Sequence, residues 1–190
     1  MITEQQYTDA AKKIGCEPAA IKAVDTVESN GCGMIAGKPV ILFEPHIFWK
    51  ELKSVGIDPE KYTATHGDML YPTWGAKPYP SGQTNQWTRL DLAVKIHREA
   101  ALRSCSWGRY QIMGFNHKAT GAETIQDFVN QMYKGDPVHL DLFVNYIKNV
   151  RLDSKLKSKD WKGFAKGYNG AAYAKNKYDI KLEAAYNKYK

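Results

Sequence analysis

The chain has 190 residues, which is enough for one well-filled core or for two small lobes with a cleft between them. Hydrophobic residues make up 43% and charged residues 25%, and no run approaches the roughly 18 to 20 apolar residues of a membrane span, which excludes a self-anchored membrane protein. The formal charge is +7; residues 151–190 carry 11 Lys and Arg against 4 Asp and Glu, whereas residues 1–150 carry 16 of each, so the basic surface is local.

The N-terminal segment predicts two short helices. Thr3 and Gln6 form a capping box, apolar residues recur at helical spacing, and Gly15 ends the pattern, which predicts a helix over residues 4–14. Pro18 suits the first turn of a second helix, whose apolar stripe leads to Glu28. The first helix lacks the basic stretch and long apolar run of a secretory signal. We therefore expect a protein made in a cytoplasm without a signal peptide.

The segment that follows changes from helical to extended and loop character. Residues 40–43, VILF, predict a short β-strand, and the residues after Pro45 predict a helix. Residues 58–88 are rich in proline, tyrosine and tryptophan, and they predict a long loop of the kind that often binds ligands.

Helices dominate the predicted structure of the second half. One is expected from Arg89 to about Arg103, and two more over residues 122–134 and 137–150. The face of the first of these helices is predicted to be formed by Leu92, Ile96 and Ala100. From Trp161 onward the pattern is again helical, and the expected breaks are at Gly163, Gly167 and Gly170.

The cysteine and histidine residues argue against two kinds of site. Cys16, Cys32 and Cys105 form no CxxC pair, which is typical of free thiols and not of a disulfide framework or a zinc ribbon. The five histidines contain no HExxH motif and no close pair, which argues against a hydrolytic zinc site. We expect no metal and no other cofactor.

Glu28 ends the second predicted helix at the edge of its apolar face, within the sequence TVESNG. The negative end of the helix dipole and partial burial against Ile21 and Val24 both disfavour the charged carboxylate, so we expect its pKa to be raised. A raised carboxyl pKa suits a general acid near neutral pH. The alternative is an exposed glutamate on a fraying turn.

Two further segments combine glycines with side chains that suit sugars: GRYQIM at residues 108–113 and GYNGAAY at residues 167–173. Gln111 and Asn169 can hydrogen-bond an N-acetyl or hydroxyl group. The aromatic side chains that can pack on a pyranose face are Trp107, Tyr110 and Tyr168. Each segment alone is more typical of a packed turn, but the three segments in this order favour a saccharide site.

The order VES, GRYQIM, GYNG resembles the lysozyme-like superfamily, in which a helix-terminal catalytic Glu precedes GLMQI-type and AYNAG-type motifs. From about Pro18 to the C-terminus, and especially through VILFEPHIF, the chain is more similar to the N-acetylmuramidase domain of phage endolysins. The match to the GLMQI-type motif is partial, with Arg109 and Tyr110 in place of Leu and Met. In the AYNAG-type motif, Gly167 replaces the first Ala. These departures concern substrate contacts and not the position of Glu28.

The resemblance implies a mainly α (α+β) fold, a lysozyme-like helical domain with a small β element next to the active-site cleft. Residues 1–190 would form a single catalytic domain without a separate cell-wall-binding domain. The implied activity is that of an endolysin, a peptidoglycan hydrolase that cleaves the β-1,4 bond between N-acetylmuramic acid and N-acetylglucosamine and causes bacterial lysis. We expect a monomer that acts on peptidoglycan after release through a membrane hole made by another protein.

The resemblance also implies roles for the carboxylates. Glu28 would protonate the leaving glycosidic oxygen, and Glu44, just after the VILF strand, would lie across the cleft and orient or deprotonate water; its alternative role is to cap the next helix. Asp68 is the reserve candidate. A carboxyl separation of roughly 6.5 to 9.5 Å would indicate inversion, and roughly 5 to 5.5 Å retention. Arg109 could hold Glu28 or a muramyl lactate or form a surface ion pair, and His46 is a structural or a positioning residue.

Several alternatives stay open. A lytic transglycosylase would use the same Glu28 and release anhydro sugars, and a chitosanase-like enzyme is electrostatically disfavoured by the basic C-terminal region. A non-catalytic protein could instead bind nucleic acid or the envelope through that region, although we expect no nucleic-acid partner. As a further hypothesis, that region contacts an anionic outer membrane through seven lysines: Lys155, Lys157, Lys159, Lys162, Lys175, Lys177 and Lys181.

Overall fold

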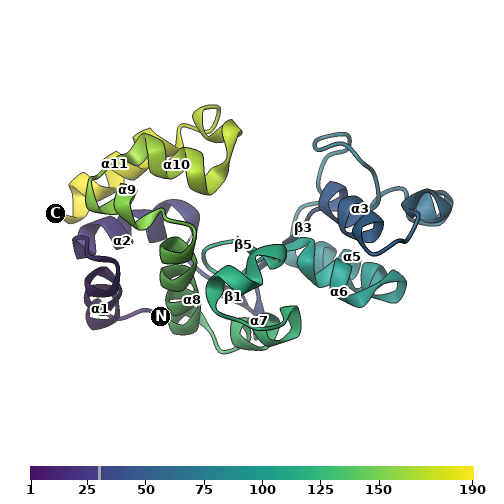
Figure 1. Ribbon diagram of the computed structural model, residues 1–190, viewed down its shortest axis with the longest axis horizontal. Coiled ribbons are helices and arrows are strands. Elements are labelled where there is room, and N and C mark those ends of the chain that lie inside the picture. Colours follow the sequence, from purple (N-terminus) through teal and green to yellow (C-terminus); the bar gives the residue numbers. More distant parts are fainter. Residues whose placement is uncertain (30) are drawn as a thin grey trace.

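Two lobes of helices lie on either side of small antiparallel sheets in the computed structural model of the protein (Figure 1), which describes residues 1–29 and 31–190. One lobe holds both chain termini, and the other is built from residues of the middle of the chain. A single cluster of buried hydrophobic residues extends through both lobes. The prediction of a mainly helical fold with a small β element is confirmed. Within the described ranges, no helix combines the length and the apolar character that crossing a membrane requires.

The first two helices have the predicted bounds. α1 (Glu4–Ile14) begins with the expected capping box, in which the Thr3 hydroxyl accepts from the Gln6 amide and the Gln6 side chain accepts from the Thr3 amide. Gly15, with a φ of 86°, ends the helix. α2 (Pro18–Glu28) follows with proline in its first turn.

The sheets join the lobes. β1 (Met34–Ile35) and β2 (Lys38–Pro39) form a hairpin, and β3 (Ile41–Phe43) pairs with β4 (Cys105–Trp107), which pairs with β5 (Ile112–Met113). The predicted VILF strand is thereby confirmed, and the WGRYQIMG segment supplies β4 and β5. The turn between them needs glycine at position 108, because its φ is 69° and a Cβ there would lie 2.8 Å from the Met132 sulfur.

The middle lobe starts with α3 (Pro45–Ser54), then a short 3₁₀ turn (Pro59–Tyr62), α4 (Thr63–His66) and an irregular segment. The prediction that helical structure starts at Arg89 is wrong, since α5 spans Gln83–Ile96. The amides of Gln83 and Gln86 explain the early start: their oxygens accept from backbone amides of β3.

The predicted helix through residue 103 is also interrupted. α5 ends at Ile96, and the extended residue His97 caps α6 (Arg98–Arg103) by accepting from the Ala100 amide. The predicted apolar face is wrong as well, because the Leu92 side chain is 37% exposed while Ala100 is buried.

The C-terminal part contains a 3₁₀ segment (Gly114–Thr120), α7 (Ile125–Met132), α8 (Asp136–Asn149), α9 (Asp153–Lys157) and α10 (Trp161–Asn169), then a 3₁₀ turn (Ala171–Ala174) and α11 (Tyr178–Tyr189). Of the predicted breaks, only that at Gly170 is correct. Gly163 and Gly167 lie inside α10; a Cβ at Gly167 would stand 2.4 Å from a Leu152 methyl group, so this glycine serves close packing.

Candidate active site

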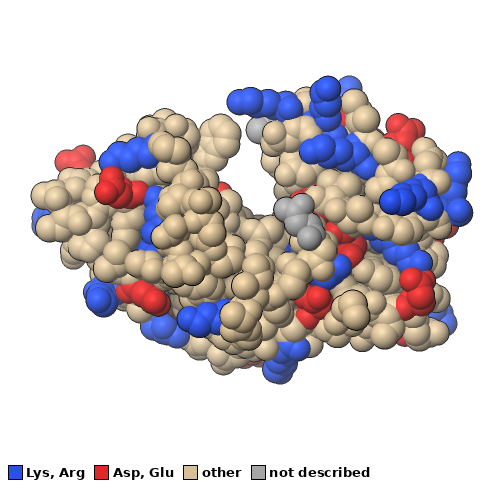
Figure 2. All heavy atoms as spheres, turned by 180° about the vertical axis from the view of Figure 1, so that it is seen from behind, with Lys and Arg blue, Asp and Glu red and all other residues tan. Residues whose placement is uncertain are grey.

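Glu28 opens onto a pocket of about 310 Å³ between the end of α2 and the turn between β4 and β5. Figure 2 shows the molecule hollowed between its two lobes. Besides Glu28, the pocket is lined by Ser29, Cys32, Ile35, Val40, Gly108, Arg109 and Gln111. Glu28 carries the only carboxyl group among these lining residues.

Burial raises the pKa of Glu28 to about 7. Two groups act in the opposite direction: the Asn169 side-chain amide, whose Nδ2 donates to Glu28 Oε1 at 3.0 Å, and the positive charge of Lys181. The predicted rise in pKa is therefore present, and burial is its leading cause. At neutral pH the carboxyl group is close to half protonated, which is the state a general acid needs.

The side chain of Asn169 is hydrogen-bonded to Glu28, so its amide nitrogen already has an acceptor before a sugar binds. It is the last residue of α10, and its Oδ1 is buried without a hydrogen-bond donor among the described residues. Tyr168 beside it donates to the Tyr110 carbonyl oxygen and stacks on Phe164, with ring centroids 5.5 Å apart. The end of α10 is thus fixed against the active-site side of α2.

Two residues near Glu28 were not predicted as site residues. Lys181, on α11, favours the charged form of Glu28. The pKa of Tyr178, at the start of α11, is raised by burial and, to a smaller extent, by the charge of Glu28. Lys181 was assigned to a basic surface, and Tyr178 has no motif that marks it. The close packing of α11 against α2, which brings them to Glu28, leaves no local signal in the sequence.

Arg109 is a buried structural residue next to the pocket, with only 8% of its surface exposed. Its guanidinium donates to both oxygens of Asp25, to Asp136 Oδ2 at 2.9 Å and to the Gly31 carbonyl oxygen at 3.0 Å. The hydrogen bond with Asp25 raises the pKa of Arg109, so the group stays cationic. The expectation of a surface ion pair is wrong, because these ion pairs lie in the interior, and within the described residues Arg109 forms no ion pair with Glu28.

The same network fixes the turn that follows Glu28. Asp136 Oδ1 accepts from the Gly33 amide at 3.1 Å, and His139 Nδ1 accepts from the Arg109 amide at 3.1 Å. Since His139 Nδ1 accepts, its Nε2 carries the proton and donates to the Met132 carbonyl oxygen. Burial lowers the pKa of His139, which agrees with this neutral form. A Cβ at Gly33 would collide with both His139 and Asp136 at 2.5 to 2.6 Å.

Gln111 lines the pocket, but its side-chain amide forms hydrogen bonds within the β4–β5 hairpin. Its Oε1 accepts from the Ser106 hydroxyl at 2.7 Å, and its Nε2 donates to the Gly108 carbonyl oxygen at 2.8 Å. Its φ of 49° lies in the left-handed region, which costs free energy for a residue other than glycine. The side-chain bonds compensate for this backbone strain.

The predicted sugar platforms Trp107 and Tyr110 are wrong, because 0% and 1% of their surfaces are exposed. The Trp107 indole donates to the Leu102 carbonyl oxygen at 2.9 Å, and the Tyr110 ring stacks on Phe143 with centroids 4.4 Å apart. Both rings belong to the core. Burying a large aromatic side chain stabilises the fold more than burying a smaller one, and here both rings are buried in the core instead of facing a ligand.

Glu44 lies at the start of α3, in the lobe opposite α2 (Figure 1), and it does not line the Glu28 pocket. The Tyr79 hydroxyl donates to its carboxylate, and His46 Nδ1 is 3.4 Å from the same oxygen. Burial raises the pKa of Glu44, opposed by Tyr79 and by the charge of Arg89. The reserve candidate Asp68 is exposed and pairs with Lys77 at 3.2 Å.

The remaining predictions concern the thiols and the basic region. Cys16, Cys32 and Cys105 are free, as predicted. Within residues 1–29 and 31–190, no group of three His, Cys, Asp or Glu side chains is placed to hold a metal ion. Lys and Arg side chains gather on the lobe of α10 and α11, including beside the hollow (Figure 2). Three of the seven lysines are ion-paired: Lys155 with Asp160, Lys157 with Asp153 and Lys159 with Glu17.

Comparisons with known proteins agree with this geometry. A family model described as N-acetylmuramidase matches residues 17–190. A crystal structure of the endolysin of Burkholderia AP3 phage superposes with a TM-score of 0.87 at 36% sequence identity, and the match covers 99% of this chain and 70% of that one. No curated protein sequence matches significantly. Since the family model spans most of the chain and includes Glu28 and its pocket, the chain belongs to the N-acetylmuramidase family.

Proposed function

We propose that Glu28 is the general acid with which this muramidase, a peptidoglycan hydrolase, cleaves the β-1,4 bond between N-acetylmuramic acid and N-acetylglucosamine. The observation that carries the proposal is a carboxyl group with a pKa of about 7 that opens onto a pocket. The one other charged residue in that pocket, Arg109, already pairs with the buried Asp25 and the partly buried Asp136. Glu28 is therefore the proton donor that a bound glycan strand would meet.

The surroundings of Glu28 suit a carboxyl group that gives up its proton during the reaction. Burial favours the neutral acid before transfer, so the proton is available at neutral pH. After the proton has moved to the leaving oxygen, the existing hydrogen bond from Asn169 and the charge of Lys181 stabilise the carboxylate that remains. We assign Asn169 and Lys181 as positioning residues, which stabilise the carboxylate and do not react.

Hydrolysis is proposed over the transglycosylase reaction, in which the sugar closes on its own 6-hydroxyl. Mass spectrometry of digested, purified peptidoglycan separates the two, because a hydrolase leaves reducing muramic ends, whereas a transglycosylase leaves anhydro ends that lack one water. We expect reducing ends. Anhydro ends would identify a transglycosylase, and the absence of soluble fragments from folded protein would contradict both enzymes.

A substitution tests whether Glu44 is a second catalytic carboxylate, as the resemblance implies. Because Glu44 is bound by Tyr79 and stands outside the pocket, we expect Glu44→Gln to retain kcat within about tenfold of the wild type, less than the loss of a general acid or base. The amide oxygen of Gln can still accept from Tyr79. A fall in kcat as large as that of Glu28→Gln, in folded protein, would make Glu44 a catalytic residue.

We also propose that the unpaired part of the basic C-terminal region contacts anionic envelope polymers. Lys175 and Lys177 are exposed and without carboxylate partners among the described residues. Reversing both charges should weaken killing of intact cells and leave digestion of purified wall unchanged, whereas reversal at Lys12 and Lys53 should change neither. Equal loss of both activities would assign the lysines to the fold or the site. Release through a membrane hole stays a prediction.

A further inference from the structure

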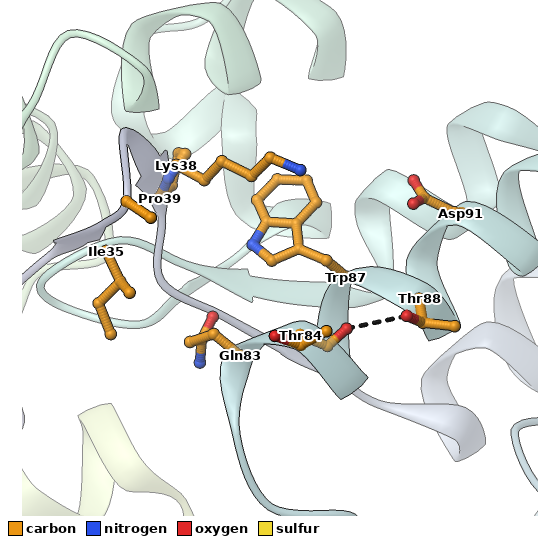
Figure 3. A pocket seen from close by; sticks show the side chains of 9 residues that line it. Ile35, Lys38, Pro39, Gln83, Thr84, Trp87, Thr88 and Asp91 are labelled. Atoms are coloured by element: carbon orange, nitrogen blue, oxygen red, sulfur yellow. Dashed lines mark hydrogen bonds between the residues drawn. The ribbon is translucent and has the colours of Figure 1, made fainter.

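A second pocket lies beside the Glu28 pocket and shares Ile35 with it. It has a volume of about 320 Å³ and is formed by the β1–β2 hairpin on one side and by α5 on the other (Figure 3). Because Ile35 borders both pockets, a linear polymer that occupies the first can continue into the second. The new pocket contains none of the residues assigned to catalysis above.

Trp87 provides a rigid aromatic surface in this pocket. Its ring is half-buried and meets the fully buried Trp107 edge to face, with centroids 5.9 Å apart, and it leans on Tyr133 at 6.3 Å. These contacts fix the ring while part of it remains accessible. Lys38 extends from β2 over the indole (Figure 3), with its Nζ 5.0 Å from the ring centroid. A cation over a solvent-exposed ring is held only weakly, so a ligand can displace it.

The polar groups of the pocket suit an uncharged ligand that both donates and accepts hydrogen bonds. Lys38 and Asp91 bring one charge of each sign, and neither has an ion-pair partner within residues 1–29 and 31–190. The Thr84 hydroxyl is exposed on the same side of α5. A sugar with hydroxyl and acetamido groups matches this set.

We propose that this pocket binds the N-acetylglucosamine unit next to the N-acetylmuramic acid unit that reacts at Glu28. The inference rests on the proposed function, since it assumes that the glycan strand lies in the Glu28 pocket. The two sugars alternate along the strand, so both neighbours of a muramic acid are N-acetylglucosamine. The assignment therefore holds for either direction of the strand. The sugar packs its apolar face on Trp87, while Asp91 accepts from its hydroxyl groups.

The test measures binding in the Glu28→Gln background, so that no substrate is consumed. The probe is the peptide-free tetrasaccharide made of two N-acetylglucosamine–N-acetylmuramic acid repeats, and the readouts are calorimetric Kd values and the indole N–H signal of Trp87 in NMR spectra. We expect the Trp87 signal to shift on binding and that of the exposed Trp74 to stay unchanged. Adding Trp87→Ala should raise Kd about tenfold or more, and adding Asp91→Ala should raise it severalfold. Adding Trp74→Ala, the matched control, should leave Kd unchanged.

The outcomes separate the subsite from the catalytic proposal. A Trp87 signal that does not move at saturating tetrasaccharide, or an unchanged Kd for folded Trp87→Ala and Asp91→Ala, would overturn the subsite. Trp87→Ala could fail to fold because its contact with Trp107 is lost. In that case the NMR shift of Trp87 and the Kd of the variant at the exposed Asp91 decide whether the pocket binds the sugar. Binding does not depend on proton transfer, so failure of Glu28 as the acid would appear only in hydrolysis rates and would leave this result interpretable.

Discussion

Glu28→Gln is expected to lower kcat on purified peptidoglycan by a factor of about 10² to 10⁴, the usual contribution of a general acid. The amide has nearly the size of the carboxyl group, and its oxygen can still accept from Asn169, so the pocket keeps its shape. What is lost is the proton. Because the substitution removes an interaction made in the transition state, kcat should fall while KM changes little.

Two companion variants make this result specific. Glu183→Gln, at an exposed position of α11, should have wild-type kinetics. Glu28→Asp keeps a carboxyl group but moves it back from the substrate by the length of one methylene group. Its kcat should therefore be lower than that of the wild type and higher than that of Glu28→Gln. Wild-type rates from Glu28→Gln, with matching thermal unfolding curves, would show that the proton comes from another group.

Arg109→Met is expected to destabilise the protein by about 3 to 5 kcal/mol, because it leaves the buried Asp25 and the partly buried Asp136 without their cation. For a chain of this length the expected loss in Tm is on the order of 10 °C. The variant also frees the Gly31 carbonyl oxygen, which Arg109 holds just after the end of α2. Activity should therefore fall even at temperatures where the variant is folded.

The matched control is Arg98→Met. Arg98 is exposed, and within residues 1–29 and 31–190 its side chain bonds only to that of Gln126, so its loss should cost less than about 0.5 kcal/mol. Unfolding in urea measures both variants. If Arg109→Met loses less than about 1 kcal/mol, the network does not brace the site, and the adjacent turn must be held by other contacts.

The sequence predicts those parts of the fold whose ends are marked by capping or helix-breaking residues nearby in the chain. The bounds of α1 and α2 follow from Thr3, Gly15 and Pro18, which act on the backbone within one turn of their own position. The start of α5 has no such local signal. It depends on Gln83 and Gln86, which bond to β3 more than 40 residues earlier, and a sequence pattern does not report that pairing.

The site shows the same division. The raised pKa of Glu28 is predictable, because its place at the apolar edge of a helix end is visible in the sequence. Its hydrogen bond with Asn169 joins residues 141 positions apart and depends on how α10 meets α2. Trp107 and Tyr110 were misassigned because an aromatic residue beside glycine has the same sequence pattern in a core as in a sugar site. Only the packing against Leu102 and Phe143 distinguishes the two.

The measurement that tests the role of Glu28 most directly is a titration of its carboxyl group by ¹³C NMR, with hydrolysis rates measured over the same pH range. The Glu28→Gln variant assigns the signal. Since the acid must be protonated to donate, we predict that the rate falls as pH rises and that both midpoints lie at about 7. A Glu28 carboxyl that titrates near its ordinary value of about 4.3, with a rate that stays constant through pH 7, would contradict Glu28 as the general acid.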